Sequence, residues 1–176
     1  EFIGFGTMNG KDGKPFKTRD GGVLRLEFLL KEISDKMYQK IIENKDLSDE
    51  EARSTADKIA LAAIKYGDLS NQASKDYIFD VDRFISFEGD TGPYILYTMV
   101  RIKSILAKYQ VAGGKLASSE INIPATKTEK DLLMQMATFN AMIDDAYNEK
   151  APHKVCAFCY DLSNVFNSFY HDTKIL

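Results

Sequence analysis

A glycine-rich corner followed by a long amphipathic segment constrains the fold of this chain most strongly. Residues 88–93 read EGDTGP, and two glycines, an aspartate and a proline within six positions are typical of a tight loop. Pro93 suits the first turn of a helix, because its missing N–H is not needed there, and Thr91 or Gly92 can supply the cap. The sequence therefore predicts a loop that opens a helix, which runs to the Gly-Gly pair at 113–114.

The helix that follows this corner is predicted to bury one face. The apolar residues at helical spacing are Ile95, Met99, Ile102 and Leu106. Aromatic and cationic residues lie off that stripe: Tyr94, Tyr97, Arg101 and Lys108. We therefore expect a helix that packs on one side and presents aromatic rings and cations on another.

Composition sets the class of protein but not its function. The 176 residues are 44% hydrophobic and 28% charged, which is enough to bury a core as one domain or two small ones. The net charge of −3 gives no overall cationic field, so a polyanion site has to come from local clustering. No apolar run approaches the roughly 18 residues of a membrane span, and no signal peptide is evident. We expect a soluble, cytoplasmic monomer with no membrane partner, excised from a longer chain because residues 2–6 read as a strand in mid-course.

Helical patterns fill most of the remaining sequence. Residues 26–41 are amphipathic, and Ser48 with Glu51 forms a capping box that opens a second helix, for which Gly67 suits the C-cap. Thr128 is the predicted cap of another helix that continues to about residue 146, and Pro152 opens the last one. Short links between the later helices predict a mainly α fold, an antiparallel helical bundle preceded by a short β-hairpin and loop.

The N-terminal hairpin region carries a cluster of cations beside glycines, namely Lys14, Lys17 and Arg19. A mobile glycine-rich backbone with cations can close over phosphoryl groups and offset their charge. A solvated basic hairpin has the same composition, and these residues alone leave both readings open.

Two further pairs suggest metal sites only superficially. Asp80 and Asp82 lack further oxygen ligands nearby, so helix capping and ion pairing with Arg83 are favoured over a bound cation. Cys156 and Cys159 form a single C-x-x-C inside an apolar helix pattern, which favours buried, reduced thiols. We predict no metal site.

Several stretches together resemble the arginyl-tRNA synthetase family. They are GKPFKTRDGG at residues 13–22, AIKYGDLS at 63–70, FDVD at 79–82 with GDTGPY at 89–94 and then Tyr97, Arg101 and residues 104–105, and YDL at 160–162 with FNSFY at 166–170. The matches run along nearly the whole chain. Each stretch alone is weak, whereas their combination in this order is specific.

The resemblance implies a class I synthetase, in which a Rossmann-type catalytic domain makes arginyl-adenylate from arginine and ATP with Mg²⁺ and then esterifies its tRNA. It implies that residues 1–85 are the end of the catalytic domain and that residues 86–176 are most of the α-helical anticodon-binding domain, without its last helix. No His-x-Gly-His segment is present in the chain. The chain alone is therefore expected to be catalytically silent.

The resemblance also implies site residues. The loop of Phe16, Lys17, Thr18 and Arg19 stands at the place of the class I Lys-Met-Ser-Lys-Ser signature, with Lys17 and Arg19 as the phosphate contacts. It departs from that signature, because Pro15 replaces its first lysine and Lys17 its serine. The implied tRNA-binding residues precede and open the long helix: Ser86, Phe87, Glu88, Gly89, Asp90, Thr91, Tyr94, Tyr97 and Arg101. Aromatic rings and Arg planes suit this role, because unpaired bases stack on them.

Other interpretations stay open at this point. Tyr94 and Tyr97 can instead cap the bundle core while Arg101 pairs with an acid. The chain can be a helical protein-interaction module without nucleic-acid binding, or the same part of a class I synthetase for another amino acid. The amino-acid pocket, which would decide the last alternative, is not in this sequence.

Overall fold

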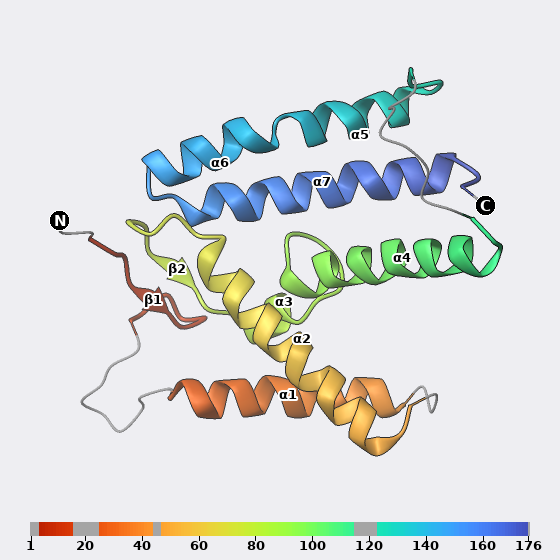
Figure 1. The fold of residues 1–176 in the computed structure, drawn as a ribbon. Coiled ribbons are helices and arrows are strands. Elements are labelled where there is room, and N and C mark those ends of the chain that lie inside the picture. Colours follow the sequence, from red (N-terminus) through yellow and green to blue (C-terminus); the bar gives the residue numbers. More distant parts are fainter. Residues whose placement is uncertain (1–3, 16–24, 44–46, 115–122, 176) are drawn as a thin grey trace.

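The computed structural model describes residues 4–15, 25–43, 47–114 and 123–175. Helices dominate it, with two short strands near the N-terminal part (Figure 1). The elements in chain order are β1 (Met8–Asn9), α1 (Leu26–Ile42), α2 (Asp49–Leu69), β2 (Tyr77–Ile78), α3 (Val81–Phe84), α4 (Gly92–Val111), α5 (Lys127–Ala137), α6 (Phe139–Asn148) and α7 (Pro152–Asp172).

The main core forms where α1 crosses α2, and small side chains allow the two helices to approach closely. Alanines repeat along one face of α2, while α1 supplies larger apolar residues, so that large side chains fill the space above small ones. The buried residues of the two helices in this core are Leu29, Ile33, Met37, Ala56, Ala60 and Ala63. The predicted capping box is confirmed: the Ser48 hydroxyl accepts from the Glu51 N–H, and the Glu51 carboxylate accepts from the Ser48 N–H.

Gly67 does not end α2, contrary to the prediction. The helix continues to Leu69 and Ser70 is its C-cap. Gly67 is buried under the ring of Phe84, and a Cβ built on it would lie 2.4 Å from the Phe84 Cε2 atom. This glycine is therefore explained by close packing rather than by a left-handed backbone.

Residues 77–84 contain both a short strand, β2, and a helical turn, α3. β2 pairs in parallel with β1, so that Met8 faces Tyr77 and Asn9 faces Ile78. A single antiparallel bridge joins Asn9 to Pro15 and closes the predicted hairpin. Asp80 then caps α3 by accepting from the N–H groups of Asp82 and Arg83.

The later helices form the predicted bundle (Figure 1). α7 lies between α4 on one side and α5 with α6 on the other, and α2 crosses from α1 toward α4 and α7. α5 and α6 follow one another in the same direction, and both run antiparallel to α4 and to α7. None of the helices in the described ranges is long and apolar enough to span a membrane.

Two details of the bundle differ from the prediction. The cap of α5 is Thr126, in a capping box with Glu129, rather than Thr128. The sequence predicted one helix to about residue 146, but the structure has two, which meet at Thr138. Thr138 is the C-cap of α5 and the N-cap of α6. The Thr138 hydroxyl donates to the carbonyl oxygen of Gln135 at 2.8 Å, a local side-chain bond that competes with helical pairing.

The buried face of α4 was also predicted wrongly. Met99 and Leu106 are 47% and 43% exposed, whereas Thr98 is 3% exposed and Tyr94 is half-buried. The face turned toward α7 carries Tyr94, Thr98 and Arg101, because α7 offers asparagine side chains there and these polar groups pair with one another. Apolar periodicity cannot identify a face that packs through hydrogen bonds.

Candidate nucleic-acid interface

The loop at residues 86–91 closes on itself before α4 begins. The Thr91 hydroxyl donates to the Ser86 carbonyl oxygen at 2.6 Å and accepts from the Tyr94 N–H at 3.3 Å, which caps α4. The Ser86 hydroxyl accepts from the Glu88 N–H, and Gly89 has a φ of 79°, which favours glycine. Phe87, Glu88, Gly89 and Asp90 are exposed around this frame, while Thr91 is buried.

Tyr66 anchors this loop from α2. Its hydroxyl donates to the Asp90 carboxylate and lies 2.9 Å from the carbonyl oxygen of Cys156 on α7. Burial, together with the hydrogen bond to Asp90, holds the pKa of Tyr66 well above its usual range, so the hydroxyl stays protonated and donating. A cavity of about 260 Å³ opens beside the loop, with Arg83, Tyr77 and Thr91 among its lining residues.

A polar cluster joins the first turns of α4 to α7. The Tyr94 hydroxyl donates to Asn164 Oδ1 at 2.7 Å, and Asn167 Nδ2 donates to the Tyr94 and Thr98 oxygens at 3.0 and 3.1 Å. The rings of Tyr94 and Tyr160 lie 5.7 Å apart. Tyr94 therefore has internal partners on α7, as one of the alternative interpretations expected.

Arg101 lies between two tyrosine rings at the edge of this cluster. Its guanidinium carbon is 4.7 Å from the centroid of Tyr97 on α4 and 4.6 Å from that of Tyr170 on α7. The same guanidinium donates to Asn167 Oδ1 and to the Tyr97 hydroxyl. No acid within the described ranges pairs with it, contrary to the alternative expectation. Tyr97 and Tyr170 are 49% and 41% exposed, so ring surface remains available on either side of the cation.

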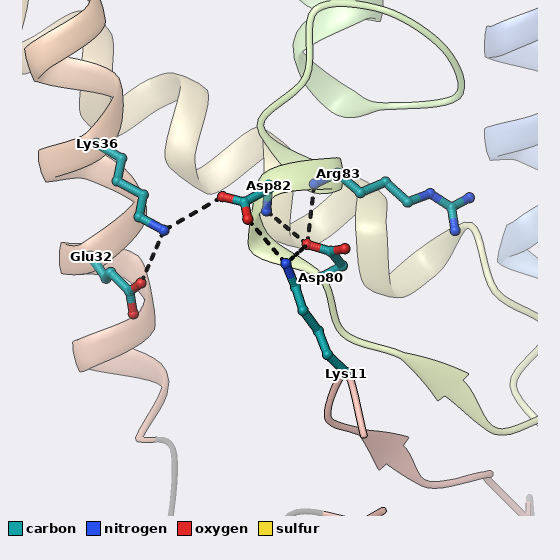
Figure 2. A network of polar contacts seen from close by, with 6 residues as sticks. All are labelled: Lys11, Glu32, Lys36, Asp80, Asp82 and Arg83. Carbon is teal, nitrogen blue, oxygen red and sulfur yellow. Dashed lines mark hydrogen bonds and ion pairs between the residues drawn. The ribbon is translucent and has the colours of Figure 1, made fainter. Parts of the chain in front are cut away.

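The acid pair of α3 binds lysine rather than Arg83 (Figure 2). Lys11 Nζ lies 3.0 Å from both Asp80 and Asp82, and Lys36 Nζ lies 3.6 Å from Asp82. Figure 2 shows the Arg83 side chain pointing away from these carboxylates, so the predicted ion pair with Arg83 is wrong. The ammonium of Lys11 stands where a bound cation would be, and within the described ranges no group of three or more His, Cys, Asp or Glu side chains could hold a metal.

The two cysteines are free, as predicted. Cys156 is buried and Cys159 is partly buried on α7. Burial raises the pKa of the Cys156 thiol to about 11 and also raises that of Cys159. Both side chains are therefore neutral thiols near pH 7, which suits packing rather than redox or metal chemistry.

The predicted phosphate-contacting loop of Phe16, Lys17, Thr18 and Arg19 lies outside the described residues. The structure does describe the turn before it, where Gly10 N–H donates to the Lys14 carbonyl and Gly13 has a φ of 74°. The roles of Lys17 and Arg19 therefore stay predictions.

Sequence reasoning missed four residues that contact the candidate site, namely Tyr66, Asn164, Asn167 and Tyr170. The two asparagines lie three positions apart and share their side of the helix with Tyr160 and Ser163, a signal that could have indicated a polar face on α7. Nothing local could have paired Tyr66 with Asp90, because the contact depends on how α2 crosses the loop.

Comparisons with known proteins agree with this architecture. A family model described as the catalytic domain of class I tRNA synthetases (R) matches residues 1–81, and the DALR anticodon binding domain model matches residues 95–176. An arginine–tRNA ligase of Agathobacter rectalis is 64% identical over 99% of this chain, and one of Alkaliphilus oremlandii is 54% identical over 100% of it. Each alignment covers 30% of the relative. An arginyl-tRNA synthetase structure from Thermus thermophilus superposes with a TM-score of 0.77 at 26% identity, covering 97% of this chain and 27% of that one.

The chain combines the end of a class I catalytic domain with an anticodon-binding helical domain. This combination defines the class of protein, the class I aminoacyl-tRNA synthetases. The loop at residues 86–91 lies between the two matched regions. The relatives decide the amino-acid type that the sequence left open. The chain belongs to the arginyl-tRNA synthetase family. It spans about 30% of the length of the two arginine–tRNA ligases named above.

Proposed function

We propose that this chain is the part of an arginine–tRNA ligase that binds the anticodon arm of arginine tRNA. The observation that carries the proposal is the Tyr97–Arg101–Tyr170 stack, whose rings remain partly exposed and which involves the helix that the loop at residues 86–91 opens. Unpaired RNA bases bind by stacking on such rings and guanidinium planes. Thr91 and Tyr94, with partners inside the protein, shape this surface, while Phe87, Tyr97 and the edge of Arg101 face the RNA.

The complete enzyme forms arginyl-adenylate from arginine and ATP and transfers the arginine to its tRNA. Lys17 and Arg19 contact the ATP phosphates and offset the charge on the leaving pyrophosphate. Mg²⁺ assists this chemistry in the family, but the described residues offer no set of ligands for it, so no step here is assigned to the metal. The chain alone binds tRNA weakly and does not catalyse the reaction.

The division of the chain follows the same proposal. Residues 1–85 complete the catalytic domain and residues 86–176 bind the anticodon arm, as a monomer in the cytoplasm. The two family matches leave residues 82–94 between them, and the proposed boundary falls inside that interval. The tRNA-facing loop therefore stands at the junction of the two functions.

Titration of the chain with fluorescent arginine tRNA tests the proposal. We expect weak binding that loosens further for an anticodon-substituted tRNA and as salt rises, since each phosphate contact releases counterions. Equal and salt-insensitive responses to both tRNAs would contradict it. A protein-interaction module predicts that unlabelled tRNA does not displace a protein bound at α4, whereas our proposal predicts displacement.

A further inference from the structure

We propose that Tyr66 is a positioning residue for RNA binding, which holds the loop at residues 86–91 in its binding shape from the catalytic side of the molecule. This inference rests on the proposed function. Tyr66 itself is half-buried on α2 and does not contact the RNA in this proposal. It acts through Asp90, an exposed residue of the loop.

The Tyr66 hydroxyl connects three segments that are far apart in sequence. It donates to the Asp90 carboxylate in the loop and lies 2.9 Å from the Cys156 carbonyl oxygen on α7. α2 lies in the region matched by the catalytic-domain model, and α7 in the region matched by the anticodon-binding model. One hydroxyl group therefore links both family regions to the loop between them.

The charge of the Asp90 carboxylate strengthens its hydrogen bond with Tyr66. A hydrogen bond to an ionised carboxylate is stronger than one between neutral groups, and the half-buried hydroxyl remains a donor throughout the physiological pH range. With its carboxylate bound to Tyr66, Asp90 is held toward α2. Without that bond, Asp90 loses its hydrogen bond to α2, and the loop is less firmly held in its binding shape.

The two ends of the loop rest on the same part of α2. Before the loop, the Phe84 ring packs on Gly67 so closely that a Cβ there would lie 2.4 Å from it. After the loop, a Cβ on Gly92 would lie 2.4 Å from the Ala62 carbonyl oxygen and 3.0 Å from the Tyr66 Cβ. Packing against α2 thus fixes the two ends of the loop. The Tyr66 hydroxyl adds a hydrogen bond from α2 to Asp90 within the loop.

Tyr66→Phe removes the hydroxyl and keeps the ring. The matched control is Tyr77→Phe, because Tyr77 is also partly buried and its hydroxyl donates to a carboxylate, that of Asp68, at 2.7 Å. Tyr77 lies on β2 and its bond does not reach the loop. Two quantities are measured for each variant: amide hydrogen exchange of residues 86–94, and the Kd for arginine tRNA.

We expect Tyr66→Phe to accelerate exchange in residues 86–94 and to raise the Kd by about 3- to 10-fold, which is less than the loss of a direct charge-assisted contact because Tyr66 acts on the RNA only through the loop. Tyr77→Phe is expected to leave both within about 2-fold of the wild type, since its hydroxyl donates to Asp68 and to no residue of the loop. Unchanged loop exchange in Tyr66→Phe would overturn the inference. Altered exchange in a chain whose wild type binds no tRNA would overturn the proposed function and leave the anchor standing.

A double-mutant cycle with Asp90→Ala separates anchoring from direct contact. Asp90 is exposed, so this variant keeps the core even if Tyr66→Phe proves poorly folded. If Tyr66 acts through Asp90, the Tyr66→Phe substitution has no further effect on loop exchange or Kd in the Asp90→Ala background. Fully additive effects would overturn the inference, because they would show that the two side chains act independently.

Discussion

The structural role of some single residues in this chain cannot be read from the neighbouring sequence. Gly67 reads as a helix terminator but is a packing site, and Arg101 reads as a free surface cation but lies between two rings. In both cases the partner comes from a distant segment, Phe84 for the glycine and Tyr170 for the arginine. The role of each residue is therefore a property of the packed state and is testable by substitution.

Replacement of Gly67 by Ala is expected to destabilise the chain, although Gly to Ala inside a helix ordinarily stabilises by about 0.5–1 kcal/mol. The new Cβ would meet the buried Phe84 ring at 2.4 Å, and overpacking of this kind costs about 1–3 kcal/mol. Urea unfolding followed by circular dichroism measures the change.

Ser54→Ala, on the exposed face of the same helix, is the control for that substitution and is expected to be neutral or slightly stabilising. A Gly67→Ala variant that gains stability like an ordinary helix position would show that the Phe84 ring moves aside.

At the scale of elements, a network of lysine and aspartate side chains joins the turn after β1, α1 and α3. Lys11 belongs to the turn after β1, Asp80 and Asp82 lie at α3, and Lys36 on α1 bridges Asp82 to Glu32 (Figure 2). These charges are largely exposed, so each pair contributes little alone. Together they tie the turn that precedes residues 16–19 to α1 and α3.

Lys11→Met is expected to lower Tm at pH 7 and to have a progressively smaller effect as the pH falls below about 4. The hydrogen bonds from Lys11 hold the pKa values of Asp80 and Asp82 below their usual range. Since the folded carboxylates bind protons less readily than the unfolded ones, their stabilisation is present above the unfolded pKa of about 3.9 and is lost as the pH falls through the lower folded value. Melting curves from pH 7 to pH 3 test this.

Lys58→Met, on the exposed face of α2, removes the same charge without breaking an ion pair that the structure describes. Its Tm is expected to follow that of the wild type at every pH. If the Lys11→Met difference persists unchanged at pH 3, the lysine stabilises the turn through packing instead.

Most features encoded within a few residues were predictable from sequence, although the Thr126 cap of α5 was placed at Thr128. Features that depend on a partner element were not predictable. The capping box of Ser48 and Glu51 and the start of α7 at Pro152 are local, and the structure confirms both. The buried face of α4 depends on asparagines some 70 positions away, and the anchor of the loop depends on Tyr66 from α2. At the candidate site, the loop and the α4 residues were predictable, while the α2 and α7 residues that hold them required the fold.

Across the whole molecule, the two proposed ligands are assigned to different parts of the chain. Lys17 and Arg19, in the stretch before α1, are assigned to ATP, whereas Tyr97 on α4 is assigned to tRNA. The two assignments are therefore separable by kinetics, even though α2 and the loop at residues 86–91 connect the two halves. Such a separation distinguishes a synthetase from a module that binds one partner only.

In the complete enzyme, Lys17→Ala or Arg19→Ala is expected to slow adenylate formation, measured by pyrophosphate exchange at saturating tRNA, by about 10²-fold or more, since removal of one transition-state donor typically costs that much. Their KM for tRNA is expected to change far less. Tyr97→Ala is expected to do the reverse, raising the KM for tRNA by about 5- to 100-fold, the range for loss of one stacked base, without changing that for ATP. Unchanged exchange in both loop variants would refute the phosphate assignment, and an equal rise of both constants in Tyr97→Ala would indicate misfolding rather than loss of a base contact.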